Sequence, residues 1–268
     1  MHIGLDSQTL SISNMVSFVI YYHSSRIENL RQTIRFLENR ESELISTSEI
    51  VLVCQDESES ISSKFPIKQF NLNTDTYNKP IMCNHGVRSS THEIIVLMDS
   101  DRILPHNYFT RNTKIATLGK TITTERLFFL EDDYSDIQIE SGDIVKTADF
   151  KSKTNEMRCK NMFSGNTIFM KQEYFSCGGM DESFVGYGYA DNDMTETMKH
   201  FGCEEIYLDE EELHLKHARS IYWHGKPLPS KSFVSFSNAK RYLKKWGKEP
   251  PAAYQQMESE IRQTLTIL

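Results

Sequence analysis

Apolar runs and polar stretches alternate along the first part of the chain. Four runs are predicted to be strands, at residues 16–22, 50–54, 67–72 and 93–98. Residues 27–37 place apolar side chains at the spacing of one helix face, and residues 79–90 have a helical pattern despite Gly86. Strands that alternate with helices predict an α/β fold with a parallel sheet and right-handed crossovers.

The pattern weakens between residues 106 and 160. There, residues 121–130 predict a pair of strands, and the acidic run 131–133 is interpreted as solvated loop rather than a metal site. Residues 1–14 are interpreted as a loose leader or an edge strand. The later predicted elements are a strand at 163–170, helices at 172–175 and 193–201, strands at 205–208 and 214–217, and two helices after residue 232, separated at Pro250 and Pro251.

The length, composition and charge of the chain favour some classes of protein and argue against others. The 268 residues suit one large domain or two small ones, and 38% hydrophobic with 25% charged residues is ordinary for a soluble protein. A formal charge of −7 argues against a general nucleic-acid binder. The sequence has no apolar run of membrane-spanning length and no signal-peptide pattern at its start. Its five cysteines form no CxxC pair, so we expect reduced thiols and a cytoplasmic location.

The most informative stretch is the strand at 93–98 and the acids that follow it. Asp99 and Asp101, separated by Ser100, stand where the strand ends, and ligands of open α/β sheets bind beyond the carboxyl ends of strands. Two carboxylates there offer oxygen ligands for a hard divalent cation that keeps positions open for phosphates. A solvated turn is the alternative, because Asp and Ser also favour turns.

A series of motifs accompanies these strands in a fixed order. The motifs are Tyr22, His23 and Arg26 after the first strand, Asp56 after the second, Lys79, Asn84 and Gly86 before Asp99-Ser100-Asp101, then Gly178-Gly179-Met180-Asp181-Glu182, Gly186-Tyr187-Gly188-Tyr189-Ala190-Asp191, and His217 last. Over residues 16–225 this order resembles the nucleotide-sugar glycosyltransferases of the GT-A fold. It is most similar to the family-2 enzymes and, in its second half, to the galactosyltransferase C-terminal domain.

The resemblance implies a Rossmann-like α/β fold with a mixed, mostly parallel sheet flanked by helices. It divides the chain into a transferase domain at residues 1–230 and a C-terminal helical extension at 231–268. Within that domain, residues 15–105 would bind the nucleotide sugar and residues 106–230 the acceptor. The long stretches 131–160 and 218–232 are candidates for a lid that excludes water.

The donor-binding residues implied by the resemblance are Tyr22, His23, Arg26, Asp56, Lys79, Asn84, Asp99 and Ser100. Asp56 matches the acid that grips uridine, and Lys79 or Lys216 could add positive charge. By their residue types alone, Arg26 could be a surface residue at a helix start and Asp56 an ordinary loop acid.

The implied metal ligands are Asp99, Asp101 and His217. His214 and His224 compete with His217 for the third place, and a lone histidine is often an ordinary surface or core residue. Oxygen ligands suit Mg²⁺ or Mn²⁺, and an imidazole ligand favours Mn²⁺.

The implied general base is Asp191, and the implied acceptor-binding residues are Gly165, Asn166, Tyr187, Gly188 and Asp193. Asp191 or Asn192 is expected to cap the helix that follows, with Asp193 as the reserve base. The sequence departs from the family pattern at Tyr187, where Trp is usual, and at Ala190, where Glu is usual. Tyr can still stack on a sugar ring, whereas the missing Glu leaves the acceptor open.

Together these features predict an inverting, metal-dependent hexosyltransferase that moves a sugar from a UDP-sugar donor to a hydroxyl of a glycan acceptor. The partners expected are a nucleotide sugar and a saccharide, with no nucleic acid and with room for peripheral association with membrane-linked acceptors. One alternative is a sugar-phosphate nucleotidyltransferase, but no Gly-rich phosphate loop follows the first strand. Another is a non-catalytic carbohydrate-binding protein on a transferase fold, and a retaining transferase is a third.

Overall fold

A computed structural model of the chain describes residues 15–116, 118–130, 154–158, 161–217, 222–223, 226–227, 231–250 and 254–255. The predicted leader, the acidic run 131–133, His224 and most of both candidate lid stretches lie outside these residues.

The first part of the chain follows the predicted order of elements closely. It comprises β1 (Val16–Tyr22), η1 (Ser24–Arg26), α1 (Ile27–Arg40), η2 (Ser42–Leu44), β2 (Glu49–Cys54), β3 (Ile67–Asn71), α2 (Lys79–Ser89) and β4 (Ile94–Asp99). Every residue of β1 and β2 is buried, as expected for strands covered on both faces. Helix α2 begins with Pro80 in its first turn, and the Asn78 side chain accepts a hydrogen bond from the backbone N–H of Ile81.

The second part differs from the prediction at several elements, and the strand expected at 163–170 begins only at Asn166. It comprises β5 (Arg102–Ile103), α3 (Tyr108–Asn112), η3 (Thr113–Ile115), β6 (Lys120–Leu130), β7 (Thr154–Arg158), β8 (Asn166–Met170), α5 (Lys171–Ser176), α6 (Ala190–His200), β9 (Glu204–His214), β10 (Tyr222–Trp223), β11 (Lys226–Pro227) and α7 (Lys231–Trp246). The expected pair of strands at 121–130 is one strand, and the two expected strands at 205–208 and 214–217 are one strand that ends at His214. The helix expected at 193–201 begins three residues earlier, at Ala190.

These long strands arise because β6 and β9 pair with each other along most of their length. Their parallel register runs from Lys120 opposite Glu204 to Phe129 opposite His214, with an irregularity between Thr124 and Arg126. A continuous ladder provides hydrogen-bond partners for the backbone groups of polar residues, which by their sequence alone would be assigned to loops. The acidic stretch 209–212, between the two strands expected there, therefore gives no sign of a strand until its partner is known.

The main sheet has the order β3-β2-β1-β4-β8-β6-β9-β5, with β7 paired to β6. Strands β1, β2, β3, β4, β6 and β9 run in one direction, and β5, β7 and β8 run in the other. The prediction of a mixed, mostly parallel sheet is confirmed. Strands β10 and β11 form a separate antiparallel pair.

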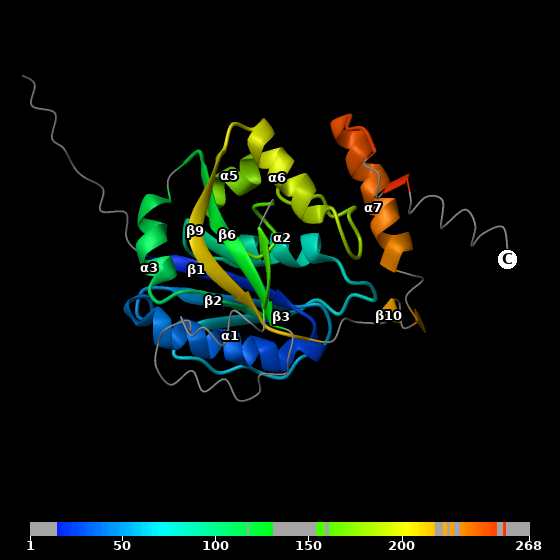
Figure 1. Ribbon diagram of the computed structural model, residues 1–268. Coiled ribbons are helices and arrows are strands. Elements are labelled where there is room, and N and C mark those ends of the chain that lie inside the picture. Colours follow the sequence, from blue (N-terminus) through cyan, green and yellow to red (C-terminus); the bar gives the residue numbers. More distant parts are fainter. Residues whose placement is uncertain are drawn as a thin grey trace, which may run out of the picture.

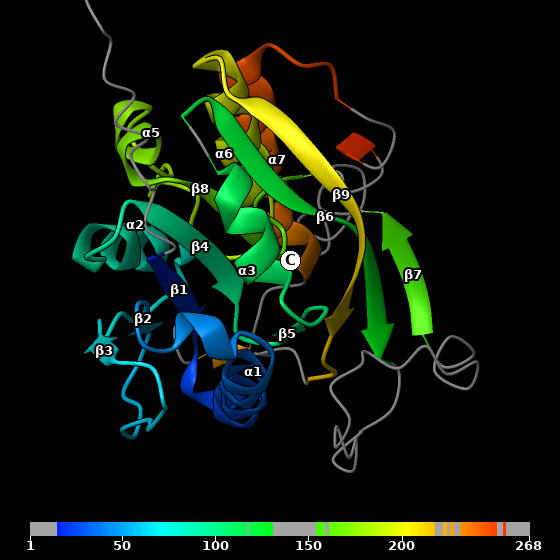
Figure 2. The ribbon, with the colours of Figure 1, turned by 90° about the vertical axis from the view of Figure 1, so that its left-hand side faces the viewer.

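Helices cover both faces of the sheet (Figure 1). On one face, Leu30, Ile34 and Leu37 of α1 pack with the side chains of β1, β2 and β4, and α3 adds Tyr108 and Phe109. The other face carries α2, α5 and α6, and Figure 2 shows these helices on the side of β4 opposite α1. The alternating side chains of β1 contribute to both apolar clusters, since Val19 and Tyr21 belong to one and Phe18 and Ile20 to the other.

Helix α7 belongs to the second of these layers. Its Ala239, Tyr242 and Leu243 are buried in the same apolar cluster as Met194 and Met198 of α6. Among the helices of the described ranges, we find none with the length and apolar character that a membrane crossing requires.

Candidate active site

The carboxyl ends of β1, β2 and β4 meet at one edge of the sheet. In the parallel register Tyr22 lies opposite Cys54, and Tyr21 lies opposite Asp99. The residues just after these strands, among them Asp56 and Asp101, therefore lie along the same edge. This is the position at which open α/β sheets bind their ligands.

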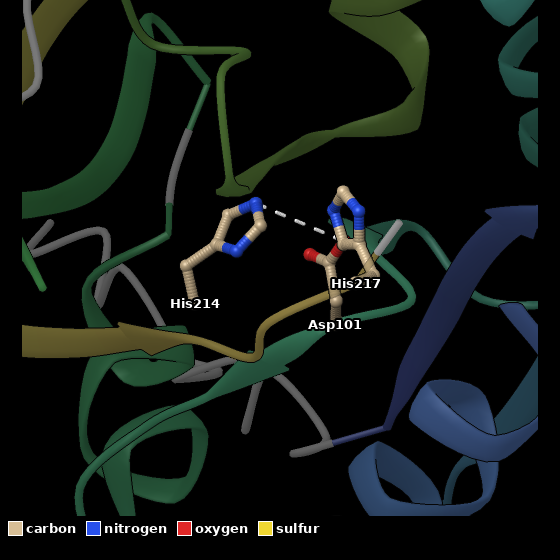
Figure 3. Close-up of side chains that lie close together, drawn as sticks. All are labelled: Asp101, His214 and His217. Atoms are coloured by element: carbon tan, nitrogen blue, oxygen red, sulfur yellow. Dashed lines mark ion pairs between the residues drawn. The ribbon is translucent and has the colours of Figure 1, made fainter. Parts of the chain in front are cut away.

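Asp101 meets two histidines that come from the end of β9. The backbone N–H of Leu215 donates to the carbonyl of Asp101 at 2.8 Å, and Arg102 pairs with His214 in the β5–β9 ladder. Asp101 Oδ2 lies 3.0 Å from His217 Nε2 and 3.8 Å from His214 Nε2. One ligand atom from each of the three residues lies within 4.8 Å of the others, and their side chains point toward one another in Figure 3.

The charge state of this cluster suits a cation. Burial raises the pKa of Asp101, but the hydrogen bond from His217 and the nearby Arg102 and His214 outweigh it and hold the pKa well below its usual range. Burial, with Arg102 next in effect, lowers the pKa of His214 to about 4. Asp101 is therefore an anion and His214 a neutral imidazole near neutral pH, which are the forms that bind metal ions.

Arg102 is a buried residue of this site that the sequence reasoning missed. Its Nη2 lies 2.7 Å from Asp99 Oδ2 and donates to the carbonyl of Ser164 at 3.0 Å. Its Nε lies 3.2 Å from Asp101 Oδ1 and 3.6 Å from Glu212 Oε1. One guanidinium therefore faces three carboxylates. The signal available in the sequence was a cation placed directly after two strand-end acids.

Burial raises the pKa of Asp99 to about 8, and the carboxylates of Asp101 and Asp191 add to this effect although Arg102 opposes it. Among these acids, protons therefore occupy Asp99 in preference to Asp101. This difference follows from the surroundings, because Asp101 faces two histidines and Asp99 does not.

Glu212 is a second buried residue that the sequence reasoning missed. Its side chain is fully buried, and its Oε2 accepts hydrogen bonds from Thr124 Oγ1 and Asn166 Nδ2, each at 2.6 Å. A side chain at Gly165 would bring its Cβ within 3.0 Å of Glu212 Oε1, so the glycine leaves room for this carboxylate. Burial raises the pKa of Glu212 although Arg102 opposes the rise. Glu212 stands among several acids of β9, so its sequence gave no reason to single it out.

Lys79 links the predicted base to the strand-end acids. Its buried ammonium lies 2.5 Å from Asp191 Oδ1 and 3.7 Å from Asp99 Oδ1. It also donates to the carbonyl of Phe163 at 2.9 Å and lies over the ring of Tyr21, 4.8 Å from the centroid. Asp191 and Asp99 therefore approach the same side chain from different parts of the fold.

The residues predicted to hold the nucleotide form a connected group. Asp56 accepts hydrogen bonds from the backbone N–H of Ser24 at 2.9 Å and from its hydroxyl at 2.5 Å, and His23 Nε2 lies 3.3 Å from Asp56 Oδ2. Arg26 points instead toward Asp101, with its Nη1 3.3 Å from Oδ2.

Several other predicted site residues are buried and already bonded within the protein. Asn84 accepts from the backbone N–H of Met180 and from the hydroxyl of Tyr174, and it donates to the carbonyl of Met180. Asn166 bonds Glu212, as described above, and Ser100 contributes its carbonyl to the hydroxyl of Thr33. The Tyr22 side chain is also buried. These positions support the site and present little surface to a ligand.

The segment before α6 adopts a backbone that favours glycine. Gly186, Gly188 and Tyr189 have φ values of 81°, 93° and 66°, and the Tyr187 side chain between them is 56% exposed. The expectation that Asp191 or Asn192 caps the helix is wrong, because Tyr189 holds the cap position without a side-chain hydrogen bond and Asp191 lies in the first turn.

Asp193 does not have the exposure that an acceptor-binding residue or reserve base needs. It is only 2% exposed. Its Oδ2 lies 2.7 Å from Lys245 Nζ, and its Oδ1 accepts from Trp246 Nε1 at 2.8 Å. Both partners belong to α7, a helix that the resemblance did not cover. Asp193 therefore joins α6 to α7.

Comparison with protein families finds a similarity to galactosyltransferases in this part of the chain. Residues 147–222 match the family described as the N-terminal domain of galactosyltransferase. The match includes Asp191 and both histidines that lie beside Asp101. A comparison with curated protein sequences found no match.

Solved glycosyltransferase structures share the fold at low sequence identity. GalNAc-T7 with UDP, GalNAc and Mn²⁺ superposes with a TM-score of 0.58 at 14% identity, over 86% of this chain and 48% of that one. The mannosyltransferase PcManGT of Pyrobaculum calidifontis, with GDP-Man and Mn²⁺, gives 0.53 at 13% identity, over 91% and 68% of the two chains. A Drosophila β1,4-galactosyltransferase 7 mutant with manganese, UDP-Gal and xylobiose gives 0.52 at 11% identity, over 82% and 79%.

The present chain thus spans about half the length of the GalNAc-T7 chain, 48%. At these identities the likeness concerns the fold. It is consistent with the family match at residues 147–222. The chain has the GT-A fold of the nucleotide-sugar glycosyltransferases, and its residues 147–222 are similar to the galactosyltransferase family.

Proposed function

We propose that the protein is an inverting glycosyltransferase that depends on a divalent metal ion. It would transfer a sugar from a UDP-sugar to a hydroxyl group of a saccharide acceptor. We assign the transferase domain to residues 1–230, with the donor bound mainly by residues 15–105 and the acceptor by residues 106–230.

One observation carries the proposal. The ammonium of Lys79 lies 2.5 Å from Asp191 Oδ1 and 3.7 Å from Asp99 Oδ1. Asp99 adjoins the Asp101–histidine cluster, and Asp191 lies in the first turn of the helix that follows the exposed Tyr187. The Lys79 side chain therefore lies between Asp191, an acid suited to activate an acceptor, and the acids suited to hold a donor.

The cluster fits a divalent cation. Asp101, His214 and His217 offer one carboxylate and two imidazoles whose ligand atoms lie within 4.8 Å of one another, and Asp99 stands next to them. Imidazole ligands suit Mn²⁺ better than Mg²⁺, and the three neighbours of like fold named above are described with Mn²⁺ or manganese. When bound, the cation would act as a Lewis acid toward the diphosphate leaving group.

Asp191 would take the proton of the acceptor hydroxyl. As the hydroxyl oxygen forms its bond to the anomeric carbon, the bond from that carbon to the diphosphate oxygen breaks, and its electron pair leaves with UDP. Attack from the face opposite the leaving group inverts the anomeric configuration. Lys79 holds the Asp191 carboxylate and places a positive charge near Asp99.

The remaining roles follow from position. Asp56, held by Ser24 and His23, would bind the uridine, and Arg26 would stand between the nucleotide and Asp101. Tyr187 would stack on the acceptor sugar, because its side chain is exposed beside the first turn of α6.

A product analysis tests the function. UDP-sugars are incubated with saccharide acceptors and Mn²⁺, and proton NMR of the new linkage should show the anomeric configuration opposite to that of the donor. Asp191→Asn should lower the turnover by a factor on the order of 10²–10⁴, the range for loss of a general base. Asp75→Asn, at an exposed position, is the control and should leave turnover unchanged.

Failure of all UDP-sugars to give a product, with or without Mn²⁺, would reject the transferase proposal. Retained configuration in the product would reject the inverting mechanism and the role of Asp191, while leaving transfer itself in place.

A further inference from the structure

Three carbonyl groups of the segment before α6 converge on one side chain of α7. Asn238 Nδ2 lies 3.0 Å from the carbonyl oxygen of Val185, 3.3 Å from that of Tyr187 and 3.1 Å from that of Gly188. We call residues 185–189 the acceptor loop. Because all three neighbours are hydrogen-bond acceptors, the Asn238 atom that faces them must be the amide nitrogen.

The acceptor loop has a backbone that would not hold its shape unaided. Three of its residues have positive φ, and one of them, Tyr189, is not a glycine, so this conformation costs free energy. Within the loop, Gly186 donates its N–H to the carbonyl of Tyr77 at 2.8 Å. Asn238, which is only 3% exposed, supplies the main side-chain contact to the loop's carbonyls among the described residues.

A second group of contacts joins α7 to α6 and to the end of the acceptor loop. Lys245 and Trp246 of α7 hold both oxygens of Asp193, which lies two residues after Asp191. The ring of Tyr242 lies 5.4 Å from that of Tyr189, centroid to centroid. Helix α7 therefore contacts the acceptor loop at its start and end and the first turn of α6.

Asn238 holds the backbone carbonyl of Tyr187, whose side chain is exposed. Loss of the amide would free the loop to place this ring differently. Within the described part of the chain, the hydrogen bonds of Asn238 go to the acceptor loop and not to Asp56 or the Asp101 cluster. The effect of Asn238 should therefore be selective for the acceptor.

We propose that Asn238 is a positioning residue for the acceptor, which fixes the acceptor loop so that Tyr187 presents its ring to a saccharide. This makes α7 part of the acceptor site, although it follows the segment that resembles glycosyltransferases. The proposal rests on the proposed function for the identity of the ligand, but the hold on the loop does not depend on it.

Two substitutions test the role of the amide. Asn238→Asp keeps the side-chain size and turns a carboxylate toward three carbonyls, and Asn238→Ala removes the donor without adding charge. Ser237→Asp places the same new charge at the neighbouring, exposed position and is the matched control. Hydrogen exchange of the wild-type and variant chains reports on the loop itself, independently of any activity.

Amide exchange at residues 185–189 should accelerate by about tenfold or more in both Asn238 variants, since each lost hydrogen bond shifts the opening equilibrium. The acceptor KM should rise by about tenfold, the equivalent of one or two hydrogen bonds, while Mn²⁺-dependent UDP affinity and hydrolysis of the UDP-sugar in water stay unchanged. Ser237→Asp should match the wild type in every measurement. If Asn238→Asp fails to fold, Asn238→Ala carries the test.

Unchanged loop exchange in Asn238→Ala would overturn the proposal. So would faster exchange with an unchanged acceptor KM, or an equal loss of transfer, hydrolysis and UDP affinity, which would indicate a general structural role. If the wild-type protein neither binds UDP nor transfers sugar, the proposed function fails, and the exchange measurement alone still decides whether Asn238 holds the loop.

Discussion

Replacement of Arg102 by methionine should destabilise the fold strongly, because one buried guanidinium faces three carboxylates. Its nitrogen atoms lie 2.7 Å from Asp99, 3.2 Å from Asp101 and 3.6 Å from Glu212. The Arg102 side chain is 5% exposed and that of Glu212 is 0% exposed, so water cannot replace the lost charge. Methionine keeps much of the side-chain length and removes only the charge and the donors.

The magnitude follows from the cost of leaving buried charge without its partner. Removing one member of a buried ion pair costs about 3–5 kcal/mol. At roughly 2–4 °C per kcal/mol for a chain of this size, the melting temperature should fall by roughly 6–20 °C. Arg102→Lys should recover part of this loss, since lysine restores the charge without the fork of donors.

Thermal and denaturant unfolding of the variants measure this effect. Arg111→Met is the control, because Arg111 is half exposed and its ion pair with Glu210 at 2.6 Å should contribute about 1 kcal/mol or less. Glu212→Gln in the Arg102→Met background should recover stability, since it removes one of the charges left unpaired. A loss for Arg102→Met no larger than that for Arg111→Met would refute the reasoning.

Three further predictions follow from the site. His214→Ala and His217→Ala should each weaken Mn²⁺ binding by about tenfold or more, as measured by electron paramagnetic resonance. The control His200→Ala, at an exposed position, should leave Mn²⁺ binding unchanged. Equal Mn²⁺ affinity in all variants would exclude the cluster as the metal site. Burial raises the pKa of Asp56, but hydrogen bonds from Ser24 and Cys54 bring it below its usual value. The Asp56 carboxylate therefore stabilises the folded protein fully above about pH 4, and this contribution is lost as the pH falls through the pKa of Asp56 in the folded state. The melting temperature should therefore fall less steeply with acid in Asp56→Asn than in the wild type, and parallel curves would contradict this. Asn84→Ala should lower the free energy of unfolding by about 1–3 kcal/mol without weakening UDP binding, because Asn84 forms hydrogen bonds with Met180 and Tyr174. Weaker UDP binding at unchanged stability would show instead that Asn84 binds the donor.

The first part of the fold was predictable because each strand carries its own signal. Strand β1 has the predicted bounds, and β2 and β4 are apolar apart from Glu49 at the start of β2 and Asp99 at the end of β4. The chain there alternates strand and helix, so neighbours in sequence become neighbours in space. The acids at the end of β4 could be placed at the sheet edge for the same reason.

The second part depends on partners that are distant in sequence. Strand β9 is polar and acid-rich and is a strand because β6 pairs with it. Glu212 and Asn238 act through contacts with residues of other elements, and their own sequence surroundings mark neither of them. Arg102 follows two strand-end acids directly, but its contact with Glu212 depends on the pairing of distant strands. Asp193 was predictable as an acid in the first turn of a helix, but its burial by α7 was not.

The central claim is that the acids at the end of β4 and the histidines at the end of β9 hold a cation that binds a nucleoside diphosphate. Isothermal titration of UDP into the protein, with Mn²⁺ and then with chelator, tests this claim directly. The account predicts binding that requires Mn²⁺ and that Asp101→Asn abolishes, with Asp75→Asn unchanged. UDP binding that is equal with and without Mn²⁺, or equal in Asp101→Asn and the wild type, would contradict it.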